Sequence, residues 1–314
     1  MKGLTFKLIA ALLLCATAHG QVMNDPSAAK RNAKWLRESV WAGNVTLPVG
    51  IVYVDMDKQP AVTQPTPGCL RIKTEGSISY PETSGGNVST IVQLGKGPVF
   101  RLAGYGAYCV EPFTLCGDGE SAAIEVEGRA NPASGGHDLR HIAFYNWGVG
   151  IKTLAGYYKN GQFVPDESHA DQTDVTRCRF FKVGTVFQSE NQQSNGWNFM
   201  RCSVDVLDNK SVTLADLKRS SNVTFEGTMI NHPRVTIFKL RDYSPNNCTL
   251  ICRDLFMDLP TTTDAWFVPV EHTGPDHYKD CKWKIEISGS VPESVVKRYK
   301  VPDSLPREKW SIRL

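Results

Sequence analysis

From residue 139 onward, apolar positions recur in one pattern: an apolar residue, two spacers, a small or apolar residue, one spacer and a larger apolar residue. Clear copies begin at Leu139, Val175, Phe199, Phe225 and Tyr278, and a weaker copy beginning at Leu250 has Arg253 in its middle position. Successive copies start 36, 24, 26, 25 and 28 residues apart. Periods of this length are typical of solenoids, in which a unit buries its apolar face only against neighbouring units.

The repeats contain short segments of alternating polarity, separated by Asn, Asp and Gly, and helical periodicity is absent from this part of the chain. We therefore predict an all-β fold, a single-stranded right-handed parallel β-helix whose strands pair between repeats. The middle positions of the pattern are expected to stack inside it: Ile142, Cys178, Cys202, Thr228 and Cys281. Antiparallel hairpins between residues 139 and 285 would contradict this prediction.

A helix is predicted before the repeats. Residues 27–42 form an amphipathic pattern with Ser27 as the expected N-cap and Ala29, Ala33, Leu36 and Val40 on one face. Directly after it, residues 43–50 read Gly-Asn-Val-Thr-Leu-Pro-Val-Gly. This segment resembles the Gly-x-Val-x-Leu-Pro-x-Gly sequence with which many members of the pectate-lyase-like right-handed parallel β-helix superfamily leave a capping helix. The resemblance implies an architecture and a plugged end, but no specific enzyme family, because fold does not determine function.

The first residues predict export. Lys2 and Lys7 precede an apolar run over residues 8–16 and several small residues, which is typical of a secretory signal peptide over residues 1–20. We expect an N-terminal segment with the capping helix and first strand over residues 21–50, the β-helix over residues 51–290 and a tail over residues 291–314. The predicted location is secreted or periplasmic, without a membrane span because no later stretch approaches 18 apolar residues. Loss of the two lysines takes the formal charge from +3 to +1, so no nucleic-acid partner is expected.

Eight cysteines follow the predicted signal, and an even number in an exported chain permits disulfides. Cys109 and Cys116 are the expected local pair. Cys178 and Cys202 hold the same place in successive repeats, about 4.8 Å apart, which fits either a disulfide or a ladder of free thiols. No Cys-x2-Cys spacing occurs, and no metal site is expected. Asn-x-Ser/Thr sites that would make the chain a glycoprotein begin at Asn44, Asn87, Asn209, Asn222 and Asn247.

Familiar catalytic motifs are absent from the sequence: Gly-x-Ser-x-Gly, His-Glu-x-x-His, a phosphate-binding loop, a dinucleotide fingerprint and the adjacent aspartates of polygalacturonase-like hydrolases. Alternation along the strands still predicts two outward columns. The first is Ala143, Arg179, Ser203, Met229, Asp254 and Lys282, and the second is Tyr145, Phe181, Asp205, Asn231, Phe256 and Lys284. The catalytic candidates on these columns are Arg179, Asp205, Asp254 and Tyr145.

Two chemistries fit such a face. Asp205 and Asp254, two rungs or about 9.6 Å apart, would suit an inverting glycoside hydrolase. Alternatively, Arg179 would offset the carboxylate of a uronate in a glycan lyase, while a basic side chain or Tyr145 moves the proton. Outward charges also simply keep a sheet face soluble and prevent lateral pairing.

The longest interval between repeats contains an extra loop around residues 154–172. Tyr157 and Tyr158 in this loop, together with Lys282, are the substrate-binding candidates, since aromatic rings would wall a groove beside Tyr145 and Arg179. The alternative is that the rings pack the loop onto the coil below. The basic tail has the same two interpretations, contact with an anionic polymer or packing over the last coil, and we expect His137 and His141 to be structural.

The sequence thus predicts a secreted β-helix protein that acts on a polysaccharide, as a glycan lyase or a glycoside hydrolase. The alternative class is a non-catalytic glycan-binding, adhesive or virion or cell-surface structural protein. The sequence indicates no cofactor and no oligomeric state.

Overall fold

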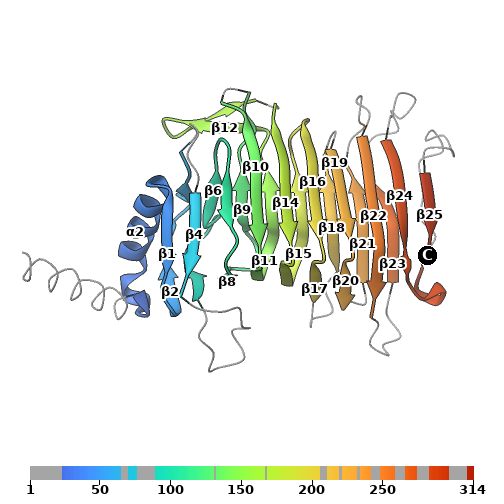
Figure 1. Cartoon of the computed structure of the whole chain (residues 1–314), viewed down its shortest axis with the longest axis horizontal. Coiled ribbons are helices and arrows are strands. Elements are labelled where there is room, and N and C mark those ends of the chain that lie inside the picture. The colour runs from blue at the N-terminus through green and yellow to red at the C-terminus, as the bar shows by residue number, and fades with distance from the viewer. Residues whose placement is uncertain are drawn as a thin grey trace, which may run out of the picture.

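The computed structural model describes residues 23–64, 70–75, 89–130, 132–166, 168–205, 211–218, 221–231, 234–241, 248–258, 266–273, 283–296 and 310–314. One α-helix, α2 (Ala29–Trp41), covers one end of a long stack of strands, and β25 (Trp310–Arg313) lies at the other end (Figure 1). The strands of the stack pair in parallel and form three faces, which we call the first, second and third sheets. The predicted signal peptide, Lys282 and most of the basic tail lie outside the described residues.

The first sheet has a strand from each coil. Its members in order are β1 (Asn44–Leu47), β4 (Leu70–Thr74), β7 (Ala107–Cys109), β10 (Ser134–Arg140), β14 (Ala170–Thr176), β16 (Ser194–Met200), β19 (Ser221–Glu226), the start of β22 (Cys248–Met257), β24 (Trp283–Ser290) and β25. Each strand pairs with the strand of the next coil, as the sequence period predicts.

The chain then turns onto the other two sheets. The second sheet contains β2 (Gly50–Val54), β5 (Ser89–Gln93), β8 (Phe113–Cys116), the start of β11 (Ile142–Thr153), the start of β15 (Arg179–Ser189), β17 (Ser203–Asp205), β20 (Met229–Asn231) and the end of β22. The third contains β3 (Ala61–Val62), β6 (Phe100–Leu102), β9 (Ala122–Val126), the ends of β11 and β15, β18 (Val212–Leu217), β21 (Arg234–Leu240) and β23 (Trp266–His272). This winding is a parallel β-helix.

The register of the central coils confirms the predicted repeat. Leu139, Val175, Phe199 and Phe225 lie side by side on successive strands of the first sheet. The predicted inward positions Ile142, Cys178, Cys202 and Thr228 are all at most 2 % exposed. Because each of these positions is buried by the rungs on either side of it, the coils form one continuous core.

The last two predicted copies of the pattern are wrong. Phe225 pairs with Cys252 rather than Leu250, so the next true copy is Cys252, Leu255 and Met257. In β24, Trp283 pairs with Cys248 at the start of β22, and the register shifts between Cys252 and Leu255. Stacking of the coils determines which residues face inward, but it does not determine the length of each turn. A prediction that assumes a constant spacing between copies is therefore wrong where a turn is longer.

The capping helix buries the face that its pattern predicts. Ala29, Ala33, Leu36 and Val40 are buried, and α2 packs against β1, β2 and β3. The predicted N-cap is wrong. A short 3₁₀ turn (Pro26–Ala28) precedes α2, and Asp25 caps this turn by accepting a hydrogen bond from the Ser27 N–H at 2.8 Å.

Aromatic rings stack along the core from rung to rung. Phe144 and Phe180 lie 4.7 Å apart at 3°, and Phe199 and Phe225 lie 4.6 Å apart at 16°. Offset stacking of this kind adds about 0.5–1.5 kcal/mol beyond burial alone. Like residues in adjacent coils therefore stabilise the parallel register.

Five of the described cysteines are free thiols: Cys109, Cys116, Cys178, Cys202 and Cys252. The predicted pairing of Cys109 with Cys116 is wrong, because Cys109 lies beside Leu139 in the first sheet and Cys116 beside Tyr145 in the second. Cys178 and Cys202 form the free-thiol version of the ladder. Cys69 and Cys281 lie outside the described residues.

Candidate functional site

A single residue turns the chain from the first sheet to the second in five successive coils. The five corner residues and their φ angles are His141 (57°), Arg177 (54°), Arg201 (53°), Gly227 (61°) and Asp254 (50°). Pairing of the preceding residues aligns them as one column, which we call the corner column. The left-handed conformation costs a residue other than glycine about 1–2 kcal/mol, so arginine at two of these corners is unusual.

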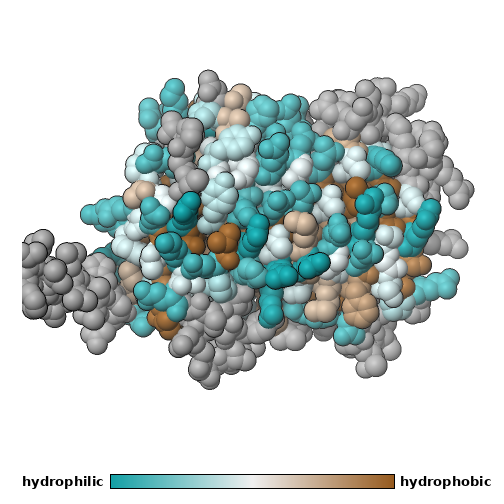
Figure 2. Space-filling model, viewed as in Figure 1, coloured by the Kyte–Doolittle hydropathy of each residue, from teal (hydrophilic) through white to brown (hydrophobic). Residues whose placement is uncertain are grey.

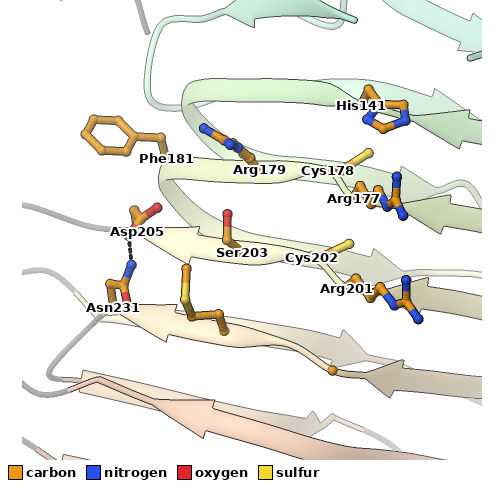
Figure 3. A pocket seen from close by; sticks show the side chains of 12 residues that line it. His141, Arg177, Cys178, Arg179, Phe181, Arg201, Cys202, Ser203, Asp205 and Asn231 are labelled. Carbon is orange, nitrogen blue, oxygen red and sulfur yellow. Dashed lines mark hydrogen bonds between the residues drawn. The ribbon is translucent and has the colours of Figure 1, made fainter. Parts of the chain in front are cut away.

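Two adjoining cavities open along the corner column, with volumes of about 730 Å³ and about 500 Å³. They share His141, Arg177, Arg201 and Gly227. We call the two cavities together the corner groove. In Figure 3 the side chains of His141, Arg177 and Arg201 follow one another on one side of Cys178 and Cys202, with Arg179, Ser203 and Asp205 on the other. The groove thus reaches from the corner onto the outer face of the second sheet.

Some of the charged side chains that line the corner groove form ion pairs, and others do not. Four arginines line it, at positions 140, 177, 179 and 201, and three carboxylates, at positions 205, 226 and 254. Arg140 is paired, since its Nε lies 2.7 Å from Asp138 Oδ1. Arg177 and Arg201 are exposed, and neither forms an ion pair with any described residue. Two neighbouring guanidinium groups without a carboxylate partner form a site suited to an anion.

Asp205 is held in place at the far side of the groove. Its Oδ1 accepts a hydrogen bond from Asn231 Nδ2 at 2.5 Å, and the two residues lie side by side on β17 and β20. Arg179 pairs with Ser203 one rung over on the same face. The groove therefore combines cations at the corner with one oriented carboxylate on the second sheet.

Three of the four predicted catalytic residues line the groove, and two of them, Arg179 and Asp205, stand in the predicted outward columns. Arg179 and Asp205 line the larger cavity and Asp254 lines the smaller one. The first outward column continues from Met229 to Phe256, so placing Asp254 there was wrong.

The remaining predicted positions lie elsewhere. Tyr145 lines neither cavity: its ring stacks on Phe181 at 5.2 Å, and Lys182 Nζ lies 5.7 Å from its centre. Lys284, predicted in the second outward column, pairs instead with Thr249 on the first sheet. Lys282 lies outside the described residues.

The loop that carries Tyr157 and Tyr158 forms a hairpin of β12 (Gly156–Lys159) and β13 (Gln162–Pro165). The Arg129 guanidinium lies 4.2 Å from the ring centre of Tyr157, and that of Arg101 lies 3.9 Å from the ring centre of Tyr158. These contacts place the hairpin against β6 of the third sheet and against the turn that follows β9. The predicted groove wall beside Tyr145 and Arg179 is therefore wrong, and both rings pack the loop onto the coil.

Sequence reasoning missed Arg177 and Arg201 and set His141 aside as structural. A signal was present, because the dipeptide Arg-Cys recurs 24 residues apart at positions 177–178 and 201–202. The cysteine of each pair marks an inward position, so the arginine before it had to occupy the turn between two sheets.

The thiols beneath the groove are unsuited to nucleophilic chemistry. Burial raises the pKa of Cys202 to about 12, and burial together with the neighbouring Cys202 raises that of Cys178 well above its ordinary value. Only the thiolate is a strong nucleophile. These cysteines act as small buried apolar residues under the corner column.

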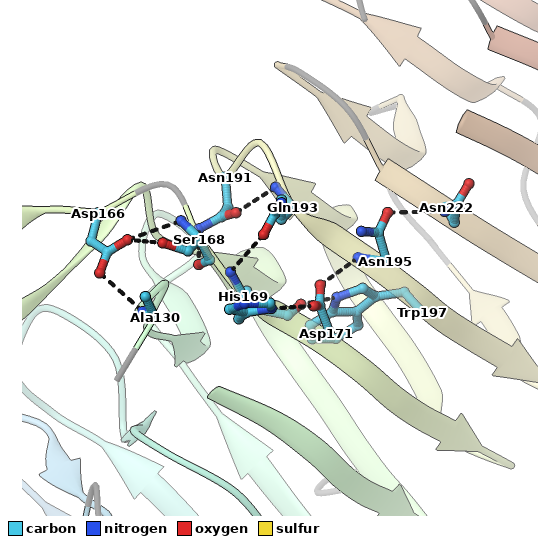
Figure 4. A network of polar contacts seen from close by, with 11 residues as sticks. Ala130, Asp166, Ser168, His169, Asp171, Asn191, Gln193, Asn195, Trp197 and Asn222 are labelled. Carbon is cyan, nitrogen blue, oxygen red and sulfur yellow. Dashed lines mark hydrogen bonds and ion pairs between the residues drawn. The ribbon is translucent and has the colours of Figure 1, made fainter. Parts of the chain in front are cut away.

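At a second corner, between the third and first sheets, polar side chains form hydrogen bonds with one another and with the neighbouring backbone (Figure 4). We call it the asparagine corner. His169 Nδ1 lies 3.0 Å from Asp171 Oδ2, and Asp171 Oδ1 accepts from the Asn195 N–H at 2.9 Å. Asn222 Nδ2 then donates to Asn195 Oδ1 at 2.9 Å. Asp171, Asn195 and Asn222 each form a hydrogen bond with a residue of the next rung.

Asn191 is the buried centre of the asparagine corner. Its Nδ2 donates to the carbonyl oxygens of Leu154 and Ser168, both at 3.1 Å, and its Oδ1 accepts from the Gln193 N–H at 2.7 Å. The side chain is fully buried. It satisfies backbone groups that the turn would otherwise leave unpaired.

The described part of the chain contains no membrane-spanning helix and no cluster of metal-binding side chains. No described helix is long and apolar enough to span a bilayer, and the face in Figure 2 is mostly polar with small separate apolar patches. No cluster of three or more His, Cys, Asp or Glu within the described ranges could hold a metal ion. Comparisons of the chain with protein-family models, with curated proteins and with solved structures found no match.

Proposed function

We propose that this protein is an exported glycan-binding β-helix that holds an acidic polysaccharide in the corner groove and cleaves it as a lyase. The observation that carries the proposal is the pair Arg177 and Arg201, which face an open cavity without ion-pair partners among the described residues. Guanidinium groups bind carboxylate or sulfate through paired, charge-assisted hydrogen bonds.

The spacing of the arginines supports a polymeric ligand. The two residues occupy successive rungs, which are about 4.8 Å apart along the axis. A glycan lying parallel to the axis would present an acidic group to each arginine in turn. The groove is open along the same direction, from His141 to Asp254, so a chain longer than one sugar fits without threading.

Placement of the carboxylates favours elimination over hydrolysis. Asp205 and Asp254 lie two rungs apart, about 9.6 Å along the axis, and the corner column is four residues before the column of Asp205. Inverting hydrolases separate their carboxyl groups by roughly 6.5–9.5 Å. The sideways offset between the two columns adds to the distance of about 9.6 Å along the axis, so Asp205 and Asp254 are too far apart for this mechanism. A lyase needs cations near the substrate carboxylate and does not need a pair of carboxylates.

Kinship with the pectate-lyase-like superfamily belongs to the same proposal. It is supported by the parallel β-helix, by the helix that covers its first coil and by the segment over residues 43–50. Export is supported by the apolar leader over residues 1–20.

The test compares the binding of polygalacturonate, dextran sulfate and neutral dextran to the purified protein at two salt concentrations. We expect the acidic polymers to bind, more weakly at high salt because screening reduces charge attraction. The double variant R177A/R201A should lose about a hundredfold in affinity, since hydrogen bonds to charged groups contribute about 1.5–3 kcal/mol each. Arg253→Ala is the matched control, because Arg253 is exposed, pairs with Glu286 at 3.0 Å and lines neither cavity.

Unchanged affinity in the double variant would place the ligand elsewhere on the molecule. Equal affinity for neutral and acidic dextrans would contradict the proposed anion site. Tight binding of an acidic polymer without any cleavage would favour the non-catalytic glycan-binding or adhesive function.

A further inference from the structure

His141 occupies the corner column one rung before Arg177. It is half-buried, lines both cavities of the corner groove, and its imidazole forms no hydrogen bond with any described residue. We infer that His141 is the catalytic base of the proposed lyase and removes the α-proton of a uronate whose carboxylate is bound by Arg177. This inference rests on the proposed function and names the group that performs its reaction.

The first support is distance. In a uronate the acidic C5–H is on the carbon next to the carboxylate, so the base must lie close to the cation that binds this carboxylate. Adjacent rungs are about 4.8 Å apart, which places the imidazole of His141 within reach of a proton beside the Arg177 site. Arg201, one rung further, would bind the carboxylate of the next sugar.

The second support is the type of side chain, because histidine is the side chain that most often acts as a general base. Tyr145 lines neither cavity, its ring stacks on Phe181, and the Lys182 ammonium group lies 5.7 Å from the ring centre. Cys178 and Cys202 are buried thiols with raised pKa values. Among the described residues, His141 is the only histidine that lines either cavity.

The surrounding charges suit the developing enolate. The charged groups that line the groove together with His141 are Arg140, Arg177, Arg179, Arg201, Asp205, Glu226 and Asp254. Arg177 and Arg201 stabilise negative charge as it spreads from C5 onto the carboxylate, which is the role of preorganised cations in such reactions. Arg140 is already occupied by Asp138.

The proposed step balances without a co-reactant. The imidazole takes the C5 proton, the C–H electron pair forms the C4–C5 double bond, and the bond between C4 and the glycosidic oxygen breaks. The leaving oxygen takes the electron pair of that bond and then a proton, which the imidazolium returns. The products are one chain that ends in an unsaturated uronate and one with an ordinary hydroxyl end.

The experiment uses His141→Asn in the full protein with polygalacturonate as the probe. Asparagine tolerates the left-handed conformation, so the corner keeps its backbone. We expect the rate of formation of unsaturated uronate, read by its absorbance, to fall at least about a hundredfold, the usual contribution of a general base. Affinity for the polymer should stay within about twofold of wild type, and the variant's pH profile of kcat/KM should lack one ionisation.

Gln172→Asn is the control, since Gln172 is an exposed residue with a φ of 52° that lines neither cavity. Wild-type turnover in His141→Asn would overturn the inference and leave the proposed function standing. Cleavage that yields reducing ends without unsaturated uronate would overturn it as well, because hydrolysis needs no α-proton transfer. A wild-type protein that binds no acidic polymer would refute the proposed function itself, and the role of His141 with it.

Discussion

The corner groove and the asparagine corner are built from the same kind of position, a turn between two sheets, yet they treat polar side chains in opposite ways. In the asparagine corner, Asp171, Asn195 and Asn222 each meet a partner on the next rung. In the corner groove, Arg177 and Arg201 meet none among the described residues. A turn whose polar side chains bond to one another helps to maintain the fold. A turn whose polar side chains lack such partners has donors available for a ligand.

The backbone of the corner column is strained as well. The corner column keeps arginine in a left-handed conformation where glycine or asparagine would be less strained. Strain of this kind persists at positions selected for something other than stability. The following variants test this contrast.

Asn191→Ala should produce the largest change, at the asparagine corner. The substitution leaves the Leu154 and Ser168 carbonyls and the Gln193 N–H without their partner in a buried site. Buried unsatisfied groups cost about 1–3 kcal/mol each, so we expect the free energy of unfolding to fall by about 3 kcal/mol. Chemical denaturation measures this loss, and affinity for an acidic glycan should not change. A loss below about 1 kcal/mol would show that water replaces the side chain.

His137 gives a pH-dependent effect of intermediate size. Its ring is buried, its Nδ1 accepts from the Ala107 N–H at 3.1 Å, and burial lowers its pKa to about 4. The unfolded chain takes up this proton near pH 6.5 and the folded chain only near pH 4, so the stability is complete above pH 6.5 and falls as the pH drops.

Between pH 6.5 and pH 5, His137 should reduce the free energy of unfolding by about 2 kcal/mol. Unfolding curves at these two pH values check this, and His137→Gln should remove that part of the dependence. His169→Gln is the control, since the His169 side chain is 45 % exposed. Identical pH dependence in wild type and His137→Gln would contradict the assignment.

Arg177→Gly should separate stability from binding. Removing the left-handed strain should raise the free energy of unfolding by about 0.5–1 kcal/mol, and losing one guanidinium should weaken acidic-glycan binding about tenfold. Arg179→Gly is the matched control, because Arg179 starts strand β15, where glycine is destabilising. Thermal unfolding of both variants distinguishes the outcomes. A destabilised Arg177→Gly would mean that the corner is not strained.

Tyr157→Ala should have the smallest effect. Loss of the cation–π contact with Arg129 is expected to cost about 0.5 kcal/mol of stability, with no change in affinity for acidic glycans. Thermal unfolding and a binding titration measure the two quantities. A clear drop in affinity with unchanged stability would instead support the original prediction that Tyr157 binds the substrate by stacking on a sugar ring.

Much of the fold was predictable because burial repeats where coils stack. Leu139, Val175, Phe199 and Phe225 gave the register of four strands directly. The register failed at β22, where Leu250 fitted the expected spacing of 25 residues although Cys252, Leu255 and Met257 fitted the apolar pattern better. Spacing was the weaker signal, since turn length is unconstrained by the core.

The candidate site was predicted only in part, for a related reason. Outward residues inside a strand follow from alternation, so Arg179 and Asp205 could be placed on one face. Residues at the corners belong to neither sheet, and alternation says nothing about where their side chains point. Arg177, Arg201 and His141 were therefore missed, and Tyr157 and Tyr158 were assigned to a groove on the wrong side of the coil.

The corner column also has a consequence for how this protein changes over generations. The residue after each corner is buried, as at Ile142, Cys178 and Cys202, while the corner itself faces solvent. An exchange at a corner therefore alters the charge of one step of the groove without disturbing the packed interior. For the proposed glycan ligand, an exchange at one corner would change the binding preference of one coil, and the gain or loss of a whole coil would lengthen or shorten the groove by one step.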